Sequence, residues 1–81
     1  MSRVSKKPYW VYVLWSASAR CYYIGISQDP QARLQQHNAG SLRGWTARHR
    51  PWELAFVEEH PHYQAARKRE LELKAQKGGR G

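Results

Sequence analysis

Two tyrosines carry the first candidate chemistry in this sequence. Tyr12 and Tyr23 lie in two short runs rich in aromatic and β-branched residues, and a hairpin of these runs would make them near cross-strand neighbours. Two adjacent phenols could act as acid, base or phosphate ligands, although tyrosine is also common in strands for packing alone. Gly25 interrupts the second run, and a glycine in mid-strand often marks close approach by a ligand or another backbone.

Arg33 and His37 form a second candidate pair. They are four residues apart, so they share a face of any helix that contains them, and Leu34 would anchor the opposite side. The guanidinium offers a rigid fork of donors suited to phosphate, and an imidazole one turn away can move a proton near neutral pH. Each residue alone is commonly just a solvated helix residue, so the pair matters in combination with other groups.

Glu70 is the most unusual of the charged residues. The stripe of the last predicted helix that faces the core consists of Tyr63, Ala66, Glu70 and Leu73. A carboxylate inside an apolar stripe needs a partner, which can be a cationic side chain or a metal ion. Arg67 and Lys74, three residues before and four after, could supply ion pairs. The sequence leaves both interpretations of Glu70 open.

The elements that must position these residues follow the order ββαβα. We expect strands over 9–15, 21–27 and 52–58, helices over 29–39 and 63–77, and room for a short helical turn near Trp45. The first run is apolar on both faces and predicts a central strand. Asp29-Pro30 is typical of a helix start, Gly40 of a helix end, and Pro61 of a strand end. The fold class predicted is α+β, with a small three-stranded antiparallel sheet flanked by helices.

Length and cysteine content restrict the organisation and the compartment. The chain has 81 residues, so we expect one domain over 8–77 with flexible basic ends at 1–7 and 78–81. One cysteine, Cys21, excludes an internal disulfide framework and a cysteine-rich zinc site. The sequence has no apolar run of roughly 20 residues, the length that spans a bilayer. It also has no apolar core of a signal peptide. We therefore expect a cytoplasmic protein, associated with the nucleoid and not with a membrane.

The charge points to an anionic partner. Lys and Arg number 14 and Asp and Glu number 6, giving a formal charge of +8, and nucleic acid is the commonest partner of small basic domains. The segment 41–51 is basic and contains a tryptophan that could stack on a base, although it could equally serve solubility. The nucleic-acid-binding residues that we expect are Gly25, Asn38, Arg43, Trp45, Arg48 and Arg50.

Together these residues resemble the GIY-YIG nuclease family. Tyr23-Ile24-Gly25 spells the second half of the motif, and Val11-Tyr12-Val13 stands at the first half, with Tyr12 matching the motif tyrosine. The spacing from Tyr23 to Arg33 and on to His37 also resembles the family pattern.

Later segments extend the resemblance over residues 9–77 and look like the small stand-alone bacterial members. They are His37-Asn38, the Arg-Pro-Trp-Glu run at 50–53, and the set Ala66, Glu70, Leu73 and Lys74. Two departures are Ile26, where many members have Lys, and the lack of any Asn after Asn38.

The resemblance implies a fold, a reaction and a set of roles. Family members have a small three-stranded antiparallel sheet and cut phosphodiester bonds with one divalent metal ion, Mg²⁺ or Mn²⁺. By matching position, Glu70 would bind the metal, which contacts the scissile phosphate and the leaving oxygen, and Arg33 would pair with the phosphate. Tyr12 or His37 would deprotonate or orient the attacking water, and Tyr23 would complete the site.

We therefore expect a metal-dependent endonuclease, acting on DNA more than on RNA, in repair or recombination. It would be a monomer or a weak homodimer, and a protein partner could supply its specificity. Two alternatives remain open at this point. The first is a non-catalytic nucleic-acid-binding module on the same scaffold; the second is a protein-interaction subunit, favoured if Trp15, Trp45 or Trp52 is exposed.

Overall fold

Three strands and three helices make up the described part of the chain, residues 7–40 and 45–77 of a computed structural model. In chain order they are β1 (Tyr9–Ser16), β2 (Cys21–Ser27), α1 (Pro30–Ala39), α2 (Trp45–Arg48), β3 (Trp52–His60) and α3 (Tyr63–Lys77). The predicted order ββαβα is confirmed, and α2 is the short turn near Trp45. Arg43 and nearly all of the expected basic ends lie outside the described residues.

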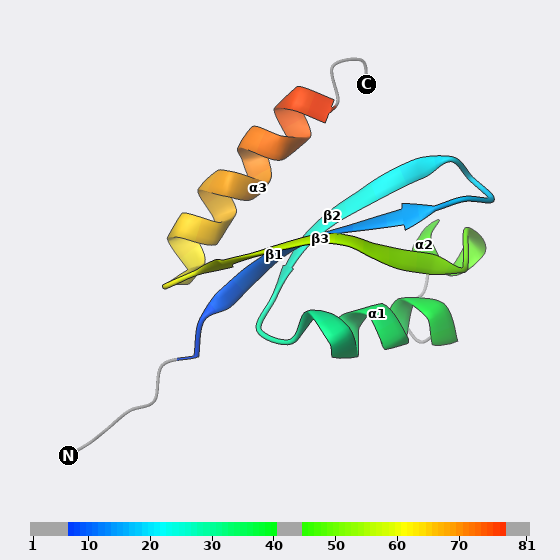
Figure 1. The fold of residues 1–81 in the computed structure, drawn as a ribbon, viewed down its shortest axis with the longest axis horizontal. Helices are drawn as coiled ribbons and strands as arrows, with labels where there is room; N and C mark the ends of the chain where they lie inside the picture. The colour runs from blue at the N-terminus through cyan, green and yellow to red at the C-terminus, as the bar shows by residue number, and fades with distance from the viewer. Residues whose placement is uncertain (1–6, 41–44, 78–81) are drawn as a thin grey trace.

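The strands form one antiparallel sheet in the order β2-β1-β3 (Figure 1). The prediction that the first strand is central is confirmed, because β1 pairs along its length with both neighbours. Tyr12 pairs with Gly25 of β2 and with Val57 of β3. The register with β3 shifts between Val13 and Leu14. A strand buried on both faces needs apolar residues on both, which explains the continuous apolar character of β1.

Helices cover both faces of the sheet, so the core has two halves. On one face Ala66 of α3 packs with Val11 and Ile24. On the other face Leu34 of α1 packs against Tyr12, Leu14 and Trp52, which β1 and β3 contribute. Figure 1 shows α3 on one side of the strands and α1 on the other. Successive side chains of β1 point to opposite faces of the sheet, so Val11 faces α3 and Tyr12 faces α1.

The helix boundaries have local causes. The Asp29 side chain accepts a hydrogen bond of 3.1 Å from the backbone N–H of Ala32, and Pro30 occupies the first turn of α1. Gly40 ends α1 in the left-handed region, with φ of 78°. The third strand runs two residues beyond the predicted Glu58, up to the residue before Pro61. Among the described residues, no helix is both long and apolar enough to cross a membrane.

Candidate active site

Tyr12, Tyr23 and His37 form a polar aromatic cluster between the sheet and α1. The Tyr12 hydroxyl lies 3.3 Å from Nε2 of His37. The ring centroids of Tyr23 and His37 are 5.0 Å apart, and those of the two tyrosines 6.2 Å. Arg33 completes the group, because its charge acts on both Tyr12 and His37. The structure thus brings together four of the five residues that the sequence nominated.

The register and α1 together explain this geometry. Leu14, not Tyr12, lies directly opposite Tyr23, so the two tyrosines are diagonal neighbours on one face of the sheet. His37 is 2% exposed and shares the buried side of α1 with Leu34, whereas the sequence had placed Leu34 opposite it. Arg33 is only partly buried. The helix thus presents its imidazole to the tyrosines, and the partly buried Arg33 donates to Oε1 of Gln36 at 3.0 Å while its charge acts on Tyr12.

Gly25 makes room for the Tyr12 ring. A Cβ atom at Gly25 would lie 2.6 Å from the Tyr12 hydroxyl oxygen and 2.7 Å from Cζ, closer than real contacts allow. The sequence predicted that another group would approach Gly25 closely, and that group is the Tyr12 side chain, not a ligand or a backbone. Gly25 is buried beneath that phenol, and its expected contact with nucleic acid stays a prediction. Its role is to let Tyr12 lie flat against β2.

The protonation states follow from burial. Burial, and next the neighbouring Tyr23, raise the pKa of Tyr12 to about 12. Burial, and next the charge of Arg33, lower the pKa of His37 from its usual value near 6.5. At neutral pH the phenol therefore keeps its proton and the imidazole is uncharged. A neutral imidazole can accept a proton, whereas a phenol with so high a pKa is a weak acid and does not form a phenolate base at neutral pH.

His37 also has a polar atom without a partner. Its Nδ1 is buried and makes no hydrogen bond. If the Tyr12 hydroxyl donates to Nε2, the ring proton of neutral His37 is on Nδ1. A donor at that position is unpaired, which costs free energy that the fold must recover elsewhere. Buried polar atoms left in this state are concentrated at functional sites.

Glu70 stands apart from the other four residues. It belongs to α3, on the opposite face of the sheet, and it is 7% exposed. Its Oε1 accepts a bond of 2.7 Å from Nη1 of Arg67, and its Oε2 lies 3.1 Å from Nζ of Lys74. Both ion pairs considered from the sequence are therefore present. The predicted core-facing position of Glu70 is also observed, beside Ala66, which is fully buried.

The surroundings of Glu70 are compatible with one hydrated divalent ion. The described residues contain no group of three or more His, Cys, Asp or Glu side chains that could enclose a metal. Mg²⁺ keeps several of its waters and can be held by one or two carboxylates, so a single glutamate can suffice. Arg67 and Lys74 are about half exposed, so either side chain could move into solvent to make room for an ion at the Glu70 carboxylate.

The Asn38 side chain has a structural role in the fold. Its amide nitrogen donates to the Trp52 carbonyl at 3.0 Å, and its amide oxygen accepts from the Trp52 N–H at 2.6 Å. Both polar ends of the side chain are therefore used to join α1 to the start of β3. The nucleic-acid contact expected of Asn38 stays a prediction.

Arg50 is also largely engaged with the backbone. Its Nε donates to the Ala47 carbonyl at 2.8 Å, and its Nη1 donates to the Asn38 carbonyl at 3.3 Å. Its guanidinium lies over Gly40, where an added Cβ would meet Nη1 at 2.8 Å. The charge stays exposed. Arg50 can therefore attract phosphate, while its bonds hold the ends of two helices.

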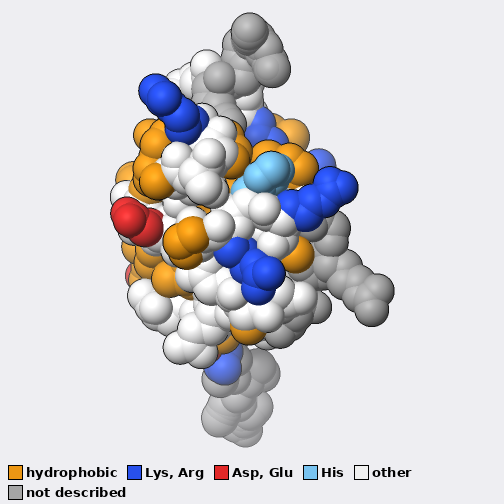
Figure 2. All heavy atoms as spheres, turned by 90° about the vertical axis from the view of Figure 1, so that its right-hand side faces the viewer, with side chains coloured by type: hydrophobic (Ala, Val, Ile, Leu, Met, Phe, Trp, Pro, Cys, Tyr) orange, Lys and Arg blue, Asp and Glu red, His pale blue; other side chains and the backbone are white. Residues whose placement is uncertain are grey.

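Trp45 and Arg48 remain free to meet a nucleic acid. Trp45 is 47% exposed and packs one side against Trp52, at a centroid distance of 5.6 Å. Arg48 is exposed as well. Figure 2 shows this end of the molecule, where basic side chains and a histidine surround apolar ones. Trp52, in contrast, is 2% exposed and donates its indole N–H to the Thr46 carbonyl at 2.9 Å.

Ser16 is a positioning residue that the sequence did not single out. It is fully buried at the end of β1, where its hydroxyl donates to the His49 carbonyl at 2.8 Å and accepts from the Ala19 N–H at 3.1 Å. These bonds tie the β1–β2 turn to the segment after α2. The sequence feature that could have indicated this role is a serine at the end of an apolar strand. The same feature is also common in ordinary turns.

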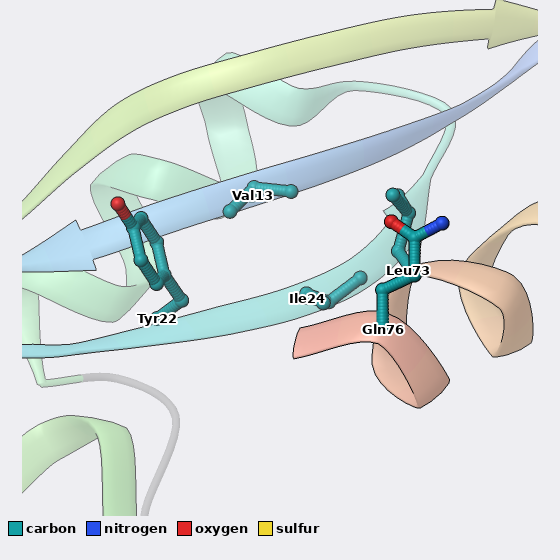
Figure 3. Close-up of a pocket in the computed structure, with 5 residues that line it drawn as sticks. All are labelled: Val13, Tyr22, Ile24, Leu73 and Gln76. Atoms are coloured by element: carbon teal, nitrogen blue, oxygen red, sulfur yellow. The ribbon is translucent and has the colours of Figure 1, made fainter. Parts of the chain in front are cut away.

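A groove of about 360 Å³ lies on the α3 face and is separate from the cluster. Figure 3 shows its lining residues, which β1, β2 and the C-terminal half of α3 contribute: Val13, Tyr22, Ile24, Leu73 and Gln76. The lining is mainly apolar and contains neither a His nor a carboxylate. The polar cluster, and not this groove, is therefore the candidate active site.

Comparison with known proteins agrees with this geometry. The family model described as the GIY-YIG catalytic domain matches residues 8–80. The structure-specific endonuclease subunit SLX1 of Meyerozyma guilliermondii is 41% identical over 59 residues, covering 67% of this chain and 20% of the relative. The corresponding slx1 subunit of Schizosaccharomyces japonicus is 46% identical over 59 residues, covering 65% of this chain and 21% of the relative.

A third relative, SLX1 homolog 1 of Trypanosoma cruzi, is 48% identical over 50 residues, covering 54% of this chain and 10% of the relative. The chain thus spans about a fifth or less of these curated relatives. They are eukaryotic subunits, so they do not support the narrower likeness to stand-alone bacterial members. No solved structure matches the chain significantly. With nearly its whole length matched, the chain belongs to the GIY-YIG family.

Proposed function

We propose that this chain is a divalent-metal-dependent endonuclease domain that hydrolyses phosphodiester bonds in DNA. The observation that carries the proposal is the Tyr12–His37 pair, with 3.3 Å between the hydroxyl oxygen and Nε2, beside Tyr23 and Arg33 in a GIY-YIG domain. Hydrolysis of a phosphodiester needs a group to take a proton from water and cations to stabilise the spread negative charge. The cluster supplies both kinds of group.

Each member of the cluster has a distinct part in the proposed reaction. Arg33 and Tyr23 are partly exposed, so they would contact the phosphate. Tyr12 and His37 lie beneath them, and the Tyr12 hydroxyl also interacts with Tyr23 and Arg33. A proton leaving the attacking water would pass to the Tyr12 oxygen as the Tyr12 proton moves to Nε2 of His37. Burial, and next the charge of Arg33, lower the pKa of His37, so that nitrogen is free at neutral pH.

Glu70 is the residue that would hold the metal ion. Its carboxylate is almost buried, and its two partners, Arg67 and Lys74, are about half exposed and could move aside for an ion. A bound ion would add positive charge at the phosphate and the leaving oxygen. Both α1 and α3 contact β2, an edge strand, so a phosphate along that edge would be accessible from both faces.

Flanking contacts would come from the end of the molecule that carries α2. Trp45 offers an exposed indole for base stacking, and Arg48 an exposed charge for the backbone. The relatives are named structure-specific endonuclease subunits, which favours branched DNA over regular duplex as the substrate of this chain. A role in DNA repair or recombination is part of the same proposal.

A cleavage panel tests the proposal. The full chain is incubated with single-stranded, duplex and branched DNA and with the matching RNAs, with and without Mg²⁺ or Mn²⁺. We expect metal-dependent product from branched DNA, reduced in Glu70→Gln and in Arg33→Ala. Cleavage that persists undiminished in both variants would exclude this site. Metal binding to the wild-type chain but not to Glu70→Gln, measured by Mn²⁺ paramagnetic relaxation, tests the assignment of Glu70 without any turnover.

A second candidate function is nucleic-acid binding without catalysis. Both carboxylate oxygens of Glu70 are already in ion pairs, which favours a structural role for this residue. Binding with a steep salt dependence, no product with either metal and no Mn²⁺ relaxation effect would select this alternative.

A further inference from the structure

β3 has a free edge with an exposed apolar run at its centre. The strand pairs with β1 on one side, and no strand among residues 7–40 and 45–77 pairs with its other side. Ala55, Phe56 and Val57 are all exposed, with 42% of Phe56 and 38% of Val57 open to solvent. Proteins normally protect such an edge with Lys, Pro or a covering element, because it is ready to pair with another chain.

A groove of about 230 Å³ adjoins this edge on the α1 side. Its lining comes from β1, β3 and the start of α1: Trp10, Asp29, Pro30, Gln31, Leu54 and Val57. Trp10 is partly exposed, and its indole N–H has no hydrogen-bond partner among the described residues. The groove can therefore take an apolar or long side chain, and the indole can donate to a carbonyl.

The charge of this region is opposite to that of the whole chain. Asp29, Glu53, Glu58 and Glu59 lie on β3 or at the groove, four of the six acidic residues of a chain with net charge +8. β3 contains no Lys or Arg. Glu58 is paired with Arg69 and hydrogen-bonded to His60, whereas Glu53 and Glu59 are exposed and make no ion pair with a described residue. This edge is therefore acidic as well as apolar.

The same charge argues against two other occupants. A phosphate backbone would be repelled here, so nucleic acid is expected at Trp45 and Arg48 and not on β3. In a second copy paired antiparallel about Phe56, Glu53 would lie opposite Glu59 on both sides of the centre. Like charges directly opposite each other destabilise a strand pair.

We propose that the free edge of β3 binds an extended segment of a partner protein in which apolar residues alternate with Lys or Arg. The segment would add a fourth strand beside β3, with its backbone bonded to the strand. Phe56 and Val57 point to opposite faces of the sheet, so the apolar side chains of the segment would cover Phe56. Its basic side chains would lie on the Val57 face, where one would cross Val57 towards Trp10, between Asp29 and Glu59. The relatives' description as subunits is consistent with a partner chain.

The test uses a fluorescent peptide of alternating Val and Lys with the length of β3, and a matched peptide of Val and Glu. A chain of net charge +8 repels the first peptide overall, so its binding reports the local acidic edge. We expect saturable binding of the Val-Lys peptide only, measured by anisotropy, and slowed hydrogen exchange at amides of residues 52–60. Phe56→Lys and Val57→Lys should each weaken binding by about tenfold or more, as loss of a central contact does.

Leu71→Lys is the matched control, because Leu71 is 49% exposed and belongs to α3 and not to β3. It should bind the peptide like the wild-type chain, and all variants should melt as the wild type does. The proposal is overturned if Phe56→Lys binds the Val-Lys peptide as tightly as the wild-type chain does. It is also overturned if the peptide slows hydrogen exchange only at amides outside β3, or if the wild-type chain does not bind the peptide. It is also overturned if single-stranded DNA displaces the peptide, or if Phe56→Lys abolishes a dimer. DNA cleavage by Phe56→Lys should be unchanged, so this inference and the nuclease proposal can fail separately.

Discussion

The Tyr12 hydroxyl and Nε2 of His37 lie 3.3 Å apart, and both side chains are almost completely buried. Burial shifts both pKa values towards the uncharged forms, upwards for Tyr12 and downwards for His37. The two groups are therefore a neutral pair at physiological pH, set beside the permanent charge of Arg33. Because Nε2 of His37 is unprotonated, the pair can take up a proton from an attacking water without first releasing one. This property suits a hydrolytic site.

Tyr12→Phe tests the proton path with the smallest change in shape. The variant keeps the ring that fills the space over Gly25 and removes only the oxygen. We expect the cleavage rate to fall by about 10²–10⁴-fold, because proton transfer through the hydroxyl is lost. The free energy of unfolding should fall by about 1–3 kcal/mol, because Nε2 of the buried His37 is left without a partner. Single-turnover cleavage and urea unfolding measure the two quantities.

Tyr22→Phe is the control for that variant, since Tyr22 is an exposed tyrosine on the same hairpin. Its cleavage rate should stay within about threefold of wild type, a change worth less than 1 kcal/mol. A full rate in Tyr12→Phe would show that the Tyr12 hydroxyl takes no part in the reaction.

The pKa of His37 predicts how stability depends on pH. An unfolded histidine titrates near 6.5, and burial followed by the Arg33 charge holds the folded value below that. Between the two values the unfolded state binds more protons, so the free energy of unfolding rises with pH and levels off above about 6.5. Acidification through this window should therefore destabilise the protein. Urea unfolding across the window, with NMR titration of the ring, measures the effect.

His37→Gln should lose this part of the pH dependence, while His49→Gln should keep it. His49 follows α2 and contacts Trp45, outside the cluster. The cleavage rate should fall with acid in the same window, because protonated His37 cannot accept a proton. A His37 that titrates above 6.5 by NMR would contradict the argument.

The sequence predicted the elements well because their signals are local. Asp29-Pro30, Gly40 and Pro61 each act on the adjacent backbone, so the helix and strand ends could be placed within about two residues. The central position of β1 also followed from one local property, its two apolar faces. The extension of β3 to His60 was missed because Glu58, Glu59 and His60 are polar. Their ladder bonds to β1, a long-range feature, keep them in the strand.

The candidate site was less predictable, because its members meet through tertiary contacts. The spacing of Arg33 and His37 indicated one helix face, yet packing against β1 buried one and left the other partly exposed. Asn38 carried no signal for its bonds to Trp52, which is fourteen residues away. A side chain that bonds to a distant backbone looks in sequence like any polar residue.

Asn38→Ala tests the structural role of that side chain. The substitution removes two bonds and leaves the Trp52 N–H and carbonyl unpaired in a partly buried place. We expect a loss of about 1–3 kcal/mol in the free energy of unfolding, the cost of unsatisfied buried groups. The salt dependence of DNA binding should be unchanged, because no phosphate contact is lost. If a fully folded Asn38→Ala variant showed a weaker salt dependence of DNA binding, the result would support a nucleic-acid contact by Asn38.

Gly25→Ala tests whether the glycine of the YIG run acts through Tyr12. The new Cβ would lie 2.6 Å from the Tyr12 oxygen, so the ring must move or the strands must separate. Overpacking of this kind costs about 1–3 kcal/mol of stability, and the displaced hydroxyl should lose its bond to His37. Gly40→Ala is the matched control, because its φ of 78° makes alanine cost about 1–2 kcal/mol by strain, outside the cluster. At temperatures where both variants are folded, only Gly25→Ala should lower kcat and raise the pKa of His37 towards 6.5. Equal kcat values in the two variants would mean that Gly25 matters for stability alone.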